Sequence, residues 1–311
     1  MSNFPTKDLL SGATLSKGNI ERILEIAETM APYANKEKQS DLLAGKVLAT
    51  LFYEPSTRTR LSFETAMNRL GGRVITVTGM ESSSLIKGET LYDTGKVVEN
   101  FADIVAMRHP TPGSVAELAG AVQIPVLNAG DGAGEHPTQA LLDMLTIKKE
   151  RGTIDGLTIA LVGDLKFGRT VHSLTYLLSH FKVKLILVSP ERLRMPAEQL
   201  QHFKDQKVEC IETESLEEGL KHAEVVYMTR VQKERFDDPA EYEKYKHFYI
   251  LTREMVERHN AQMTIMHPLP RVGEISLDVD DLAGAAYFRQ VKNGVALRMA
   301  LLAVMLGRQE F

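Results

Sequence analysis

The feature that most constrains the fold is an alternation of short aliphatic runs with segments of helical period. Runs rich in β-branched and aliphatic residues occupy 47–53, 74–77, 104–107, 126–127, 158–162, 184–188, 225–228 and 264–266. Between them apolar residues recur at helical spacing, for example at Ile20, Ile23, Leu24 and Ala27. Parallel strands joined by crossover helices produce this pattern. The sequence therefore predicts a doubly wound α/β fold built on parallel sheets.

A polar, glycine-punctuated segment divides this pattern near the middle of the chain. Residues 150–156 separate a long helical segment, 137–149, from a new strand. The chain has 311 residues, which is room for about two domains. We therefore expect two α/β domains of similar strand and helix pattern. The segment 294–306 is again helical and apolar, and its periodicity does not decide on which domain it packs.

Composition narrows the class of protein further. Lys and Arg number 37 against 41 Asp and Glu, a net charge of −4, which argues against a nucleic-acid coat or a polybasic membrane binder. The apolar stretch 299–306 is too short for a membrane span, and the N-terminus lacks the apolar core of a signal peptide. Cys210 is the single cysteine, which excludes an internal disulfide. We expect a cytoplasmic protein that binds neither nucleic acid nor membrane.

The most informative segment joins the first predicted strand to a predicted helix. It reads Ser56-Thr57-Arg58-Thr59-Arg60, so hydroxyls and guanidiniums meet a helix start with its unpaired N–H groups. That combination favours an anion site. The alternative is that Ser56 or Thr57 caps the helix while the arginines face solvent or pair with Glu64.

Further polar groups follow other predicted strands of the first half. They are Arg108-His109-Pro110 and the segment from Asn128 that leads into His136-Pro137-Thr138-Gln139. Open α/β sheets bind ligands beyond the carboxyl ends of their strands, so these groups and the serine-rich segment should meet at one edge. Taken alone, His136 is better explained as a helix-entry residue before a proline at the first helical position than as a catalytic residue.

The second half repeats the arrangement. Arg169 stands at a predicted helix start, Arg230 and Gln232 follow the strand 225–228, and His267-Pro268-Leu269-Pro270 follows the last strand. Prolines around Leu269 fix the backbone and leave carbonyls to accept hydrogen bonds. No dinucleotide or phosphate-loop glycine pattern is present, and the histidines lack metal-ligand spacing. The sequence therefore predicts neither a metal nor a cofactor.

Three of these motifs together carry a family resemblance. In their order along nearly the whole chain, Ser56-Thr57-Arg58-Thr59-Arg60, His136-Pro137-Thr138-Gln139 and His267-Pro268-Leu269-Pro270 resemble the carbamoyltransferases. Within that superfamily the chain is similar to aspartate carbamoyltransferase catalytic chains, because the segment from Arg230 to Arg235 matches their aspartate-binding signature. Ornithine enzymes carry a cysteine where this chain has Pro268.

The resemblance implies a fold and an assembly. It implies a carbamoyl-phosphate domain (1–137 plus 293–311), an aspartate domain (138–292) and a C-terminal helix that returns to the first domain. It also implies a homotrimer whose active sites borrow Ser83 and Lys87 from a neighbouring subunit, with Ser84 the alternative to Ser83. Separate regulatory chains occur with some relatives, although Phe167 stands where regulated members often carry tyrosine.

The resemblance also implies roles for the individual residues. Carbamoyl phosphate would be held by Ser56, Thr57, Arg58, Thr59, Arg108, His136, Gln139, Pro268 and Leu269. Arg58, Thr59, Arg108 and His136 would be catalytic, and a cis bond is expected between Leu269 and Pro270. Aspartate would be held by Lys87, Arg169, Arg230 and Gln232, while Glu54 and Arg235 would act between the domains.

The implied reaction is carbamoyl transfer to the amino group of L-aspartate in de novo pyrimidine biosynthesis. The departing phosphate would take the proton, so no paired acid and base are needed. Two alternatives remain at this point. One is a carbamoyltransferase for another amino acid such as ornithine, and the other is a non-catalytic homologue that binds phosphorylated metabolites.

Overall fold

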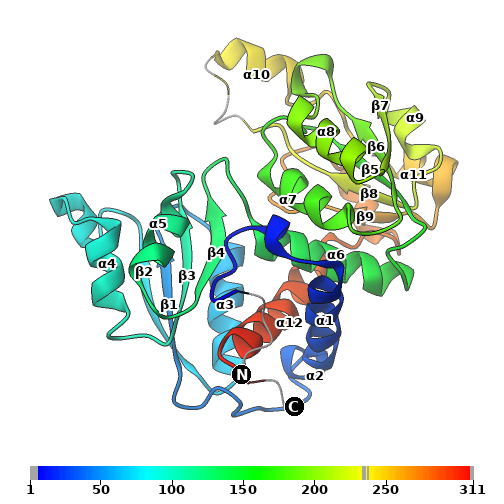
Figure 1. Ribbon diagram of the computed structural model, residues 1–311. Helices are drawn as coiled ribbons and strands as arrows, with labels where there is room; N and C mark the ends of the chain where they lie inside the picture. The colour runs from blue at the N-terminus through cyan, green and yellow to red at the C-terminus, as the bar shows by residue number, and fades with distance from the viewer. Residues whose placement is uncertain (1–5, 233–235, 237, 309–311) are drawn as a thin grey trace. The chain divides into compact units, whose positions relative to one another are not determined.

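The structure is a computed structural model that describes residues 6–232, 236 and 238–308 (Figure 1). It divides the chain into two compact units. The first comprises Met1–Leu145 and Val291–Phe311, and the second comprises Thr146–Gln290. The C-terminal segment therefore returns to the first unit, as predicted. The bounds expected for the two substrate domains, at 137 and 292, stay a prediction.

The first unit is built on a four-stranded sheet in the order β2-β1-β3-β4. The strands are β1 (Val47–Phe52), β2 (Arg73–Thr78), β3 (Ile104–His109) and β4 (Val126–Asp131). All neighbouring strands are parallel, and the register pairs Phe52 with Arg108 and Met107 with Asn128. A register shift after Met107 then pairs His109 with Asp131. The polar groups of β1, β3 and β4 consequently lie at one carboxyl edge.

Helices connect and cover these strands. They are η1 (Gly12–Thr14), α1 (Lys17–Thr29), α2 (Ala31–Ala34), α3 (Thr57–Arg69), η2 (Ser84–Lys87), α4 (Leu91–Val98), α5 (Ser114–Ala121), α6 (Pro137–Arg151) and α12 (Tyr287–Met305). Helix α1 begins with a capping box between Ser16 and Asn19 and buries the predicted apolar stripe that includes Ile20 and Leu24. Helix α3 ends before Gly71, whose φ of 78° suits glycine.

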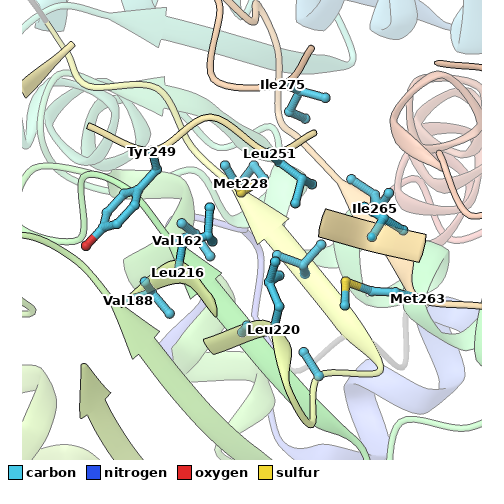
Figure 2. Packing of buried hydrophobic residues seen from close by; sticks show 14 of the residues in the cluster. Val162, Val188, Leu216, Leu220, Met228, Tyr249, Leu251, Met263, Ile265 and Ile275 are labelled. Atoms are coloured by element: carbon cyan, nitrogen blue, oxygen red, sulfur yellow. The ribbon is translucent and has the colours of Figure 1, made fainter. Parts of the chain in front are cut away.

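The second unit contains a five-stranded parallel sheet in the order β7-β6-β5-β8-β9. Its strands are β5 (Thr158–Val162), β6 (Lys184–Val188), β7 (Glu209–Thr213), β8 (Val225–Met228) and β9 (Thr264–Met266). Its helices are α7 (Arg169–Leu178), η3 (Glu191–Leu193), α8 (Ala197–Asp205), α9 (Leu216–Leu220), α10 (Pro239–Tyr245), α11 (Arg253–Asn260) and η5 (Leu277–Asp281). Val162, Val188 and Met228 pack with Leu216 and Leu251 in its core (Figure 2).

The predicted fold class is confirmed, with two differences in the strands. Strand β7 was not predicted, because it is an edge strand whose residues Glu209 and Glu212 are exposed and its sequence lacks a buried aliphatic run. Strands β3 and β4 extend past their predicted ends into the polar residues Arg108 and Asn128. Both differences arise because backbone pairing with a neighbouring strand, rather than side-chain polarity, decides whether a segment forms a strand and where that strand ends.

Candidate active site

The first anion-binding set lies at the start of α3. Strand β1 ends at Phe52 and α3 begins at Thr57, with Ser56 as an extended N-cap residue. Within the described residues the Ser56 hydroxyl makes no capping hydrogen bond, so the capping interpretation is wrong for Ser56. Arg58 is exposed and partial desolvation lowers its pKa, whereas Thr59 is buried. This helix start offers N–H groups, hydroxyls and a cation to an anionic ligand.

Arg60, one turn into the same helix, has a different environment. Its Nη1 lies 3.9 Å from Glu64 Oε1, and Glu64 in turn accepts hydrogen bonds from the hydroxyls of Thr50 and Thr76. The alternative drawn from the sequence, an arginine paired with Glu64, is therefore correct for Arg60.

Arg108 lies at the carboxyl end of β3 and is largely buried. Its Nη2 lies 2.8 Å from Glu54 Oε2, and its Nη1 donates to the carbonyl of Ala129 at 3.4 Å. The first contact is an ion pair between two residues of the first unit. The action predicted for Glu54 between the domains stays a prediction. A guanidinium fixed on two sides is preorganised for an anion or a developing oxyanion.

His136 and Gln139 lie at the start of α6. His136 is 3% exposed, and its carbonyl accepts the N–H of Gln139 at 3.0 Å. The loop before it is held by Asp131, whose carboxylate accepts the N–H groups of Gly113 and Glu135 at 3.1 and 2.7 Å. Gln139 is also buried, and its Nε2 donates to Asp143 Oδ1 at 2.8 Å.

The serine-rich loop around η2 belongs to the first unit, and most of its residues are exposed to solvent. Lys87 and Ser84 are exposed at the two ends of η2, and Ser83 is half-buried with its hydroxyl donating to the carbonyl of Met80 at 2.8 Å. Gly88 ends the turn with a φ of 90°. An exposed lysine on such a loop is accessible to a second copy of the chain, and its reach to a neighbouring site stays a prediction.

In the second unit, Asp164 joins the segments that carry the predicted aspartate-binding residues. Asp164 is fully buried after β5, and its carboxylate accepts the N–H groups of Phe167 at 2.9 Å and Gln232 at 3.4 Å. Burial raises its pKa, while these N–H groups and the charge of Arg230 oppose the rise. The side chain of Gln232 donates to the Phe167 carbonyl at 2.9 Å.

Asp164 thus ties the loop after β8 to the loop before α7, which begins at the half-buried Arg169. No role was predicted for Asp164 from the sequence. Its position directly after Gly163 at a strand end was the available signal.

The loop after β9 is held by a buried histidine and glutamate. His267 Nε2 lies 2.6 Å from Glu274 Oε1, and His267 Nδ1 accepts the N–H of Leu269 at 2.8 Å. Burial alone would raise the pKa of Glu274, but the hydrogen bond from His267 and that from the N–H of Val272 help to outweigh it and leave that pKa lowered. The Leu269-Pro270 bond is cis, as predicted, and Leu269 has a φ of 55°. Glu274 was not identified from sequence.

The remaining predicted residue, Arg235, lies outside the described residues. In the described part of the chain, no group of three or more potential ligands could hold a metal ion, and no described helix has the length and apolar character needed to cross a membrane. Fold and side chains together define a two-domain α/β protein in which each parallel sheet ends in an arginine-bearing set suited to anions.

Comparison with known proteins places the chain within this class. Residues 7–149 match the carbamoyl-phosphate-binding domain of the aspartate/ornithine carbamoyltransferases, and residues 155–305 match their aspartate/ornithine-binding domain. The chain belongs to the aspartate/ornithine carbamoyltransferase family, and it is a carbamoyltransferase.

Its relatives bear consistent names. An aspartate carbamoyltransferase catalytic subunit from Leptospira biflexa is 51% identical over 99% of both chains. The solved catalytic subunit of Methanocaldococcus jannaschii aspartate transcarbamoylase is 51% identical, covers 97% of this chain and 98% of its own, and has a TM-score of 0.91. A Trypanosoma cruzi aspartate transcarbamoylase, solved with carbamoyl phosphate and aspartate, is 42% identical over 97% of both chains, also with a TM-score of 0.91.

Proposed function

We propose that the chain is the catalytic chain of an aspartate carbamoyltransferase. It transfers the carbamoyl group of carbamoyl phosphate to the amino group of L-aspartate, giving N-carbamoyl-L-aspartate and phosphate. The observation that carries the proposal is the buried Arg108, held by Glu54 of the segment between β1 and α3 at the carboxyl edge of the first sheet. The ligands of the Trypanosoma cruzi relative support the same substrates.

Carbamoyl phosphate would bind to the first unit through its two chemically different ends. The phosphate would meet the α3 N-terminus, where Ser56, Thr57, Arg58 and Thr59 supply hydroxyls, N–H groups and a cation. The carbonyl oxygen would meet Thr59, Arg108 and His136, whose charge and dipoles stabilise the oxyanion of the tetrahedral intermediate. The carbamoyl NH2 would form hydrogen bonds with Gln139 and with the carbonyls of Pro268 and Leu269.

Aspartate would bind through its carboxylates to Arg169, Arg230 and Gln232, with Lys87 from a neighbouring subunit. Its amino nitrogen attacks the carbamoyl carbon, forming the C–N bond, and the C–O bond to phosphate then breaks with the electrons leaving on the phosphate. The departing phosphate accepts the amino proton. The chain's residues thus act by orientation and charge stabilisation.

We also propose an assembly, a pathway and a cellular location for the chain. We infer a homotrimer that shares Ser83 and Lys87 between subunits, and the exposure of Lys87 supports it. The relatives' designation as catalytic subunits supports a role alongside regulatory chains. The product suits the pyrimidine pathway, and a cytoplasmic location agrees with the thiol of Cys210 being unpaired.

The deciding experiment offers the purified chain carbamoyl phosphate with L-aspartate or with L-ornithine. We expect N-carbamoyl-aspartate with aspartate and at most about 1% of that rate with ornithine, because cationic Arg169 and Arg230 would repel the ornithine ammonium group. Citrulline as the sole product would overturn the assignment of aspartate. Binding of carbamoyl phosphate without any turnover would favour the non-catalytic homologue.

A further inference from the structure

Behind Gln139, the first unit buries two opposite charges that the proposed mechanism does not use. Asp143 lies one helical turn after Gln139 on α6 and is fully buried, and Arg298 of α12 is 2% exposed. Burial lowers the pKa of Arg298 to about 10, and the charge of Asp143 opposes this change. Arg298 therefore remains cationic at neutral pH, and the Asp143 carboxylate is the opposite charge that compensates it, since burying either charge alone would be costly.

Arg298 contacts its own helix, α12, and the neighbouring helix α3. Its Nη1 donates to the carbonyl of Gly294 at 3.2 Å, and its guanidinium lies 4.9 Å from the ring centroid of Phe63 on α3. A Cβ at Gly294 would approach Arg298 Nη1 to 2.7 Å, so glycine leaves room for the guanidinium. Figure 1 shows α12 beside α3, the helix whose start forms the anion site. Arg298 thus connects α12 with α3, and it interacts through its charge with Asp143 of α6.

The hydrogen bond to Asp143 fixes the orientation of the Gln139 side chain. A carboxylate only accepts hydrogen bonds, so the Gln139 amide must turn its Nε2 toward Asp143, as the 2.8 Å contact requires. Its Oε1 then faces away from Asp143. An amide oxygen accepts hydrogen bonds from an NH2 group but gains nothing from a methyl group of the same size.

We propose that Asp143 and Arg298 are positioning residues that orient the Gln139 amide and thereby select a carbamoyl group against an acetyl group. The inference rests on the proposed function, in which Gln139 meets the carbamoyl NH2. It extends that function by naming what discriminates carbamoyl phosphate from acetyl phosphate, two ligands that share the phosphate and the carbonyl and differ in NH2 against CH3.

The test uses Asp143→Asn and two stable phosphonates, phosphonoacetamide and acetonylphosphonate, with inorganic phosphate as a third probe. Affinities are measured by titration calorimetry on the full chain. We expect wild type to prefer the amide over the ketone about tenfold, the ratio set by one buried hydrogen bond. In Asp143→Asn the new amide can also donate to Gln139 Oε1, so both orientations open and the preference should fall to about twofold or less. Affinity for inorganic phosphate should change less than about twofold, because the α3 start is untouched.

The matched control is Asp103→Asn. Asp103 lies at the opposite, amino end of β3, where it pairs with Lys46 at 2.7 Å and accepts the N–H of Val47. It should keep the wild-type preference even if it unfolds more easily. If Asp143→Asn fails to fold with the Arg298 charge left uncompensated, the double variant Asp143→Asn/Arg298→Met removes both charges, and the same loss of preference is expected.

Retention of the full amide preference in either folded variant would overturn the inference. Equal binding of both phosphonates by wild type, with N-carbamoyl-aspartate still formed, would also refute it while leaving the proposed function intact. Wild-type chain that binds neither phosphonate and forms no product would instead refute the proposed function.

Discussion

At the scale of single residues, side chains of one type do different work according to their contacts. Arg58 and Arg60 are two residues apart on α3, yet Arg60 approaches Glu64 while Arg58 is exposed at the helix start. Arg108 and Arg298 are both buried, but Arg108 lies near the carboxyl end of β3 at the proposed site, whereas Arg298 lies on α12 away from the proposed ligands. Charge alone therefore does not identify a functional arginine.

Replacing Arg58 tests the phosphate assignment directly. Arg58→Ala removes a cation from the helix start that would hold the phosphate, so kcat should fall by about 10³-fold. Arg60→Ala is the matched control, since it removes the same group from the same helix at a position paired with Glu64, and its activity should stay within about threefold of wild type. Near-normal kcat in Arg58→Ala, measured by N-carbamoyl-aspartate formation, would refute the phosphate cradle.

His109 gives the chain a pH dependence of stability. Burial lowers its pKa from the ordinary 6.5, its ring contacts Tyr53 edge-on at 5.7 Å, and its Nδ1 accepts the N–H of Thr111 at 3.0 Å. Because the folded state favours neutral His109, its contribution is complete above about pH 6.5 and is lost as the pH falls below that value.

In His109→Asn the new side chain can still accept from Thr111 without titrating. The free energy of unfolding by urea should therefore decline less steeply below about pH 6.5, by at most about 1.4 kcal/mol per pH unit. Identical slopes in wild type and variant would show that His109 does not titrate on unfolding.

At the scale of elements, close contacts between strand ends position the side chains that follow them. Strands β5 and β8 are neighbours, and the N–H of Asp164 donates to the hydroxyl of Thr229 at 3.1 Å. Gly163 has a φ of 116°, and a Cβ there would lie 2.3 Å from the carbonyl oxygen of Thr229. The loop that carries Arg230 and Gln232 therefore depends on the absence of a side chain at Gly163.

Gly163→Ala should disturb that loop and the fold of the second unit together. A clash with backbone cannot be relieved by a rotamer change, so we expect a loss of about 3 kcal/mol or more in unfolding free energy and weaker aspartate binding. Gly156→Ala is the control, because Gly156 also has a positive φ, 89°, with nothing within 4 Å of its Cβ position. It should cost only about 1 kcal/mol of backbone strain. Equal losses in thermal and chemical unfolding of the two variants would contradict the steric argument.

At the scale of the whole molecule, the two units carry separate parts of the proposed site. The first holds Arg58, Arg108 and His136, the second holds Arg169 and Arg230, and Lys87 lies on an exposed loop. A cyclic trimer that shares Lys87 would make each site depend on two chains.

Subunit mixing tests this sharing. Homotrimers of Lys87→Ala and of Arg108→Ala should each be nearly inactive, because every site lacks one cation. After verified exchange at equal amounts, each mixed trimer contains one site with both residues intact, so about a quarter of all sites should recover. The control is each variant exchanged with itself, which should recover nothing. Failure of the mixture to gain activity would argue against a shared site.

Prediction from the sequence succeeded where the signal is local. The aliphatic runs identified the buried strands, and the polar segments that follow them placed Arg58 and His136 beyond strand ends, whereas Arg108 lies within the last two residues of β3. Asp143, Asp164 and Glu274 were not predicted. The partner of Asp143 is Gln139, one helical turn away on a buried face, and the partner of Asp164 is Gln232, 68 residues away. Glu274 meets His267 across a loop. The residues next to a carboxylate in the sequence do not show whether it faces water or makes a buried hydrogen bond.

Residue patterns alone were enough for the parallel α/β class, the helical character of the C-terminal segment and the residue types of each anion-binding set, because hydrophobic periodicity and helix-start chemistry act over a few neighbouring residues. The tertiary structure was needed to show that Glu54 meets Arg108 and that Arg298 and Asp143 lie behind Gln139. Those outcomes depend on which distant segments share a buried space. There the pairing of charges dominates because water no longer screens them.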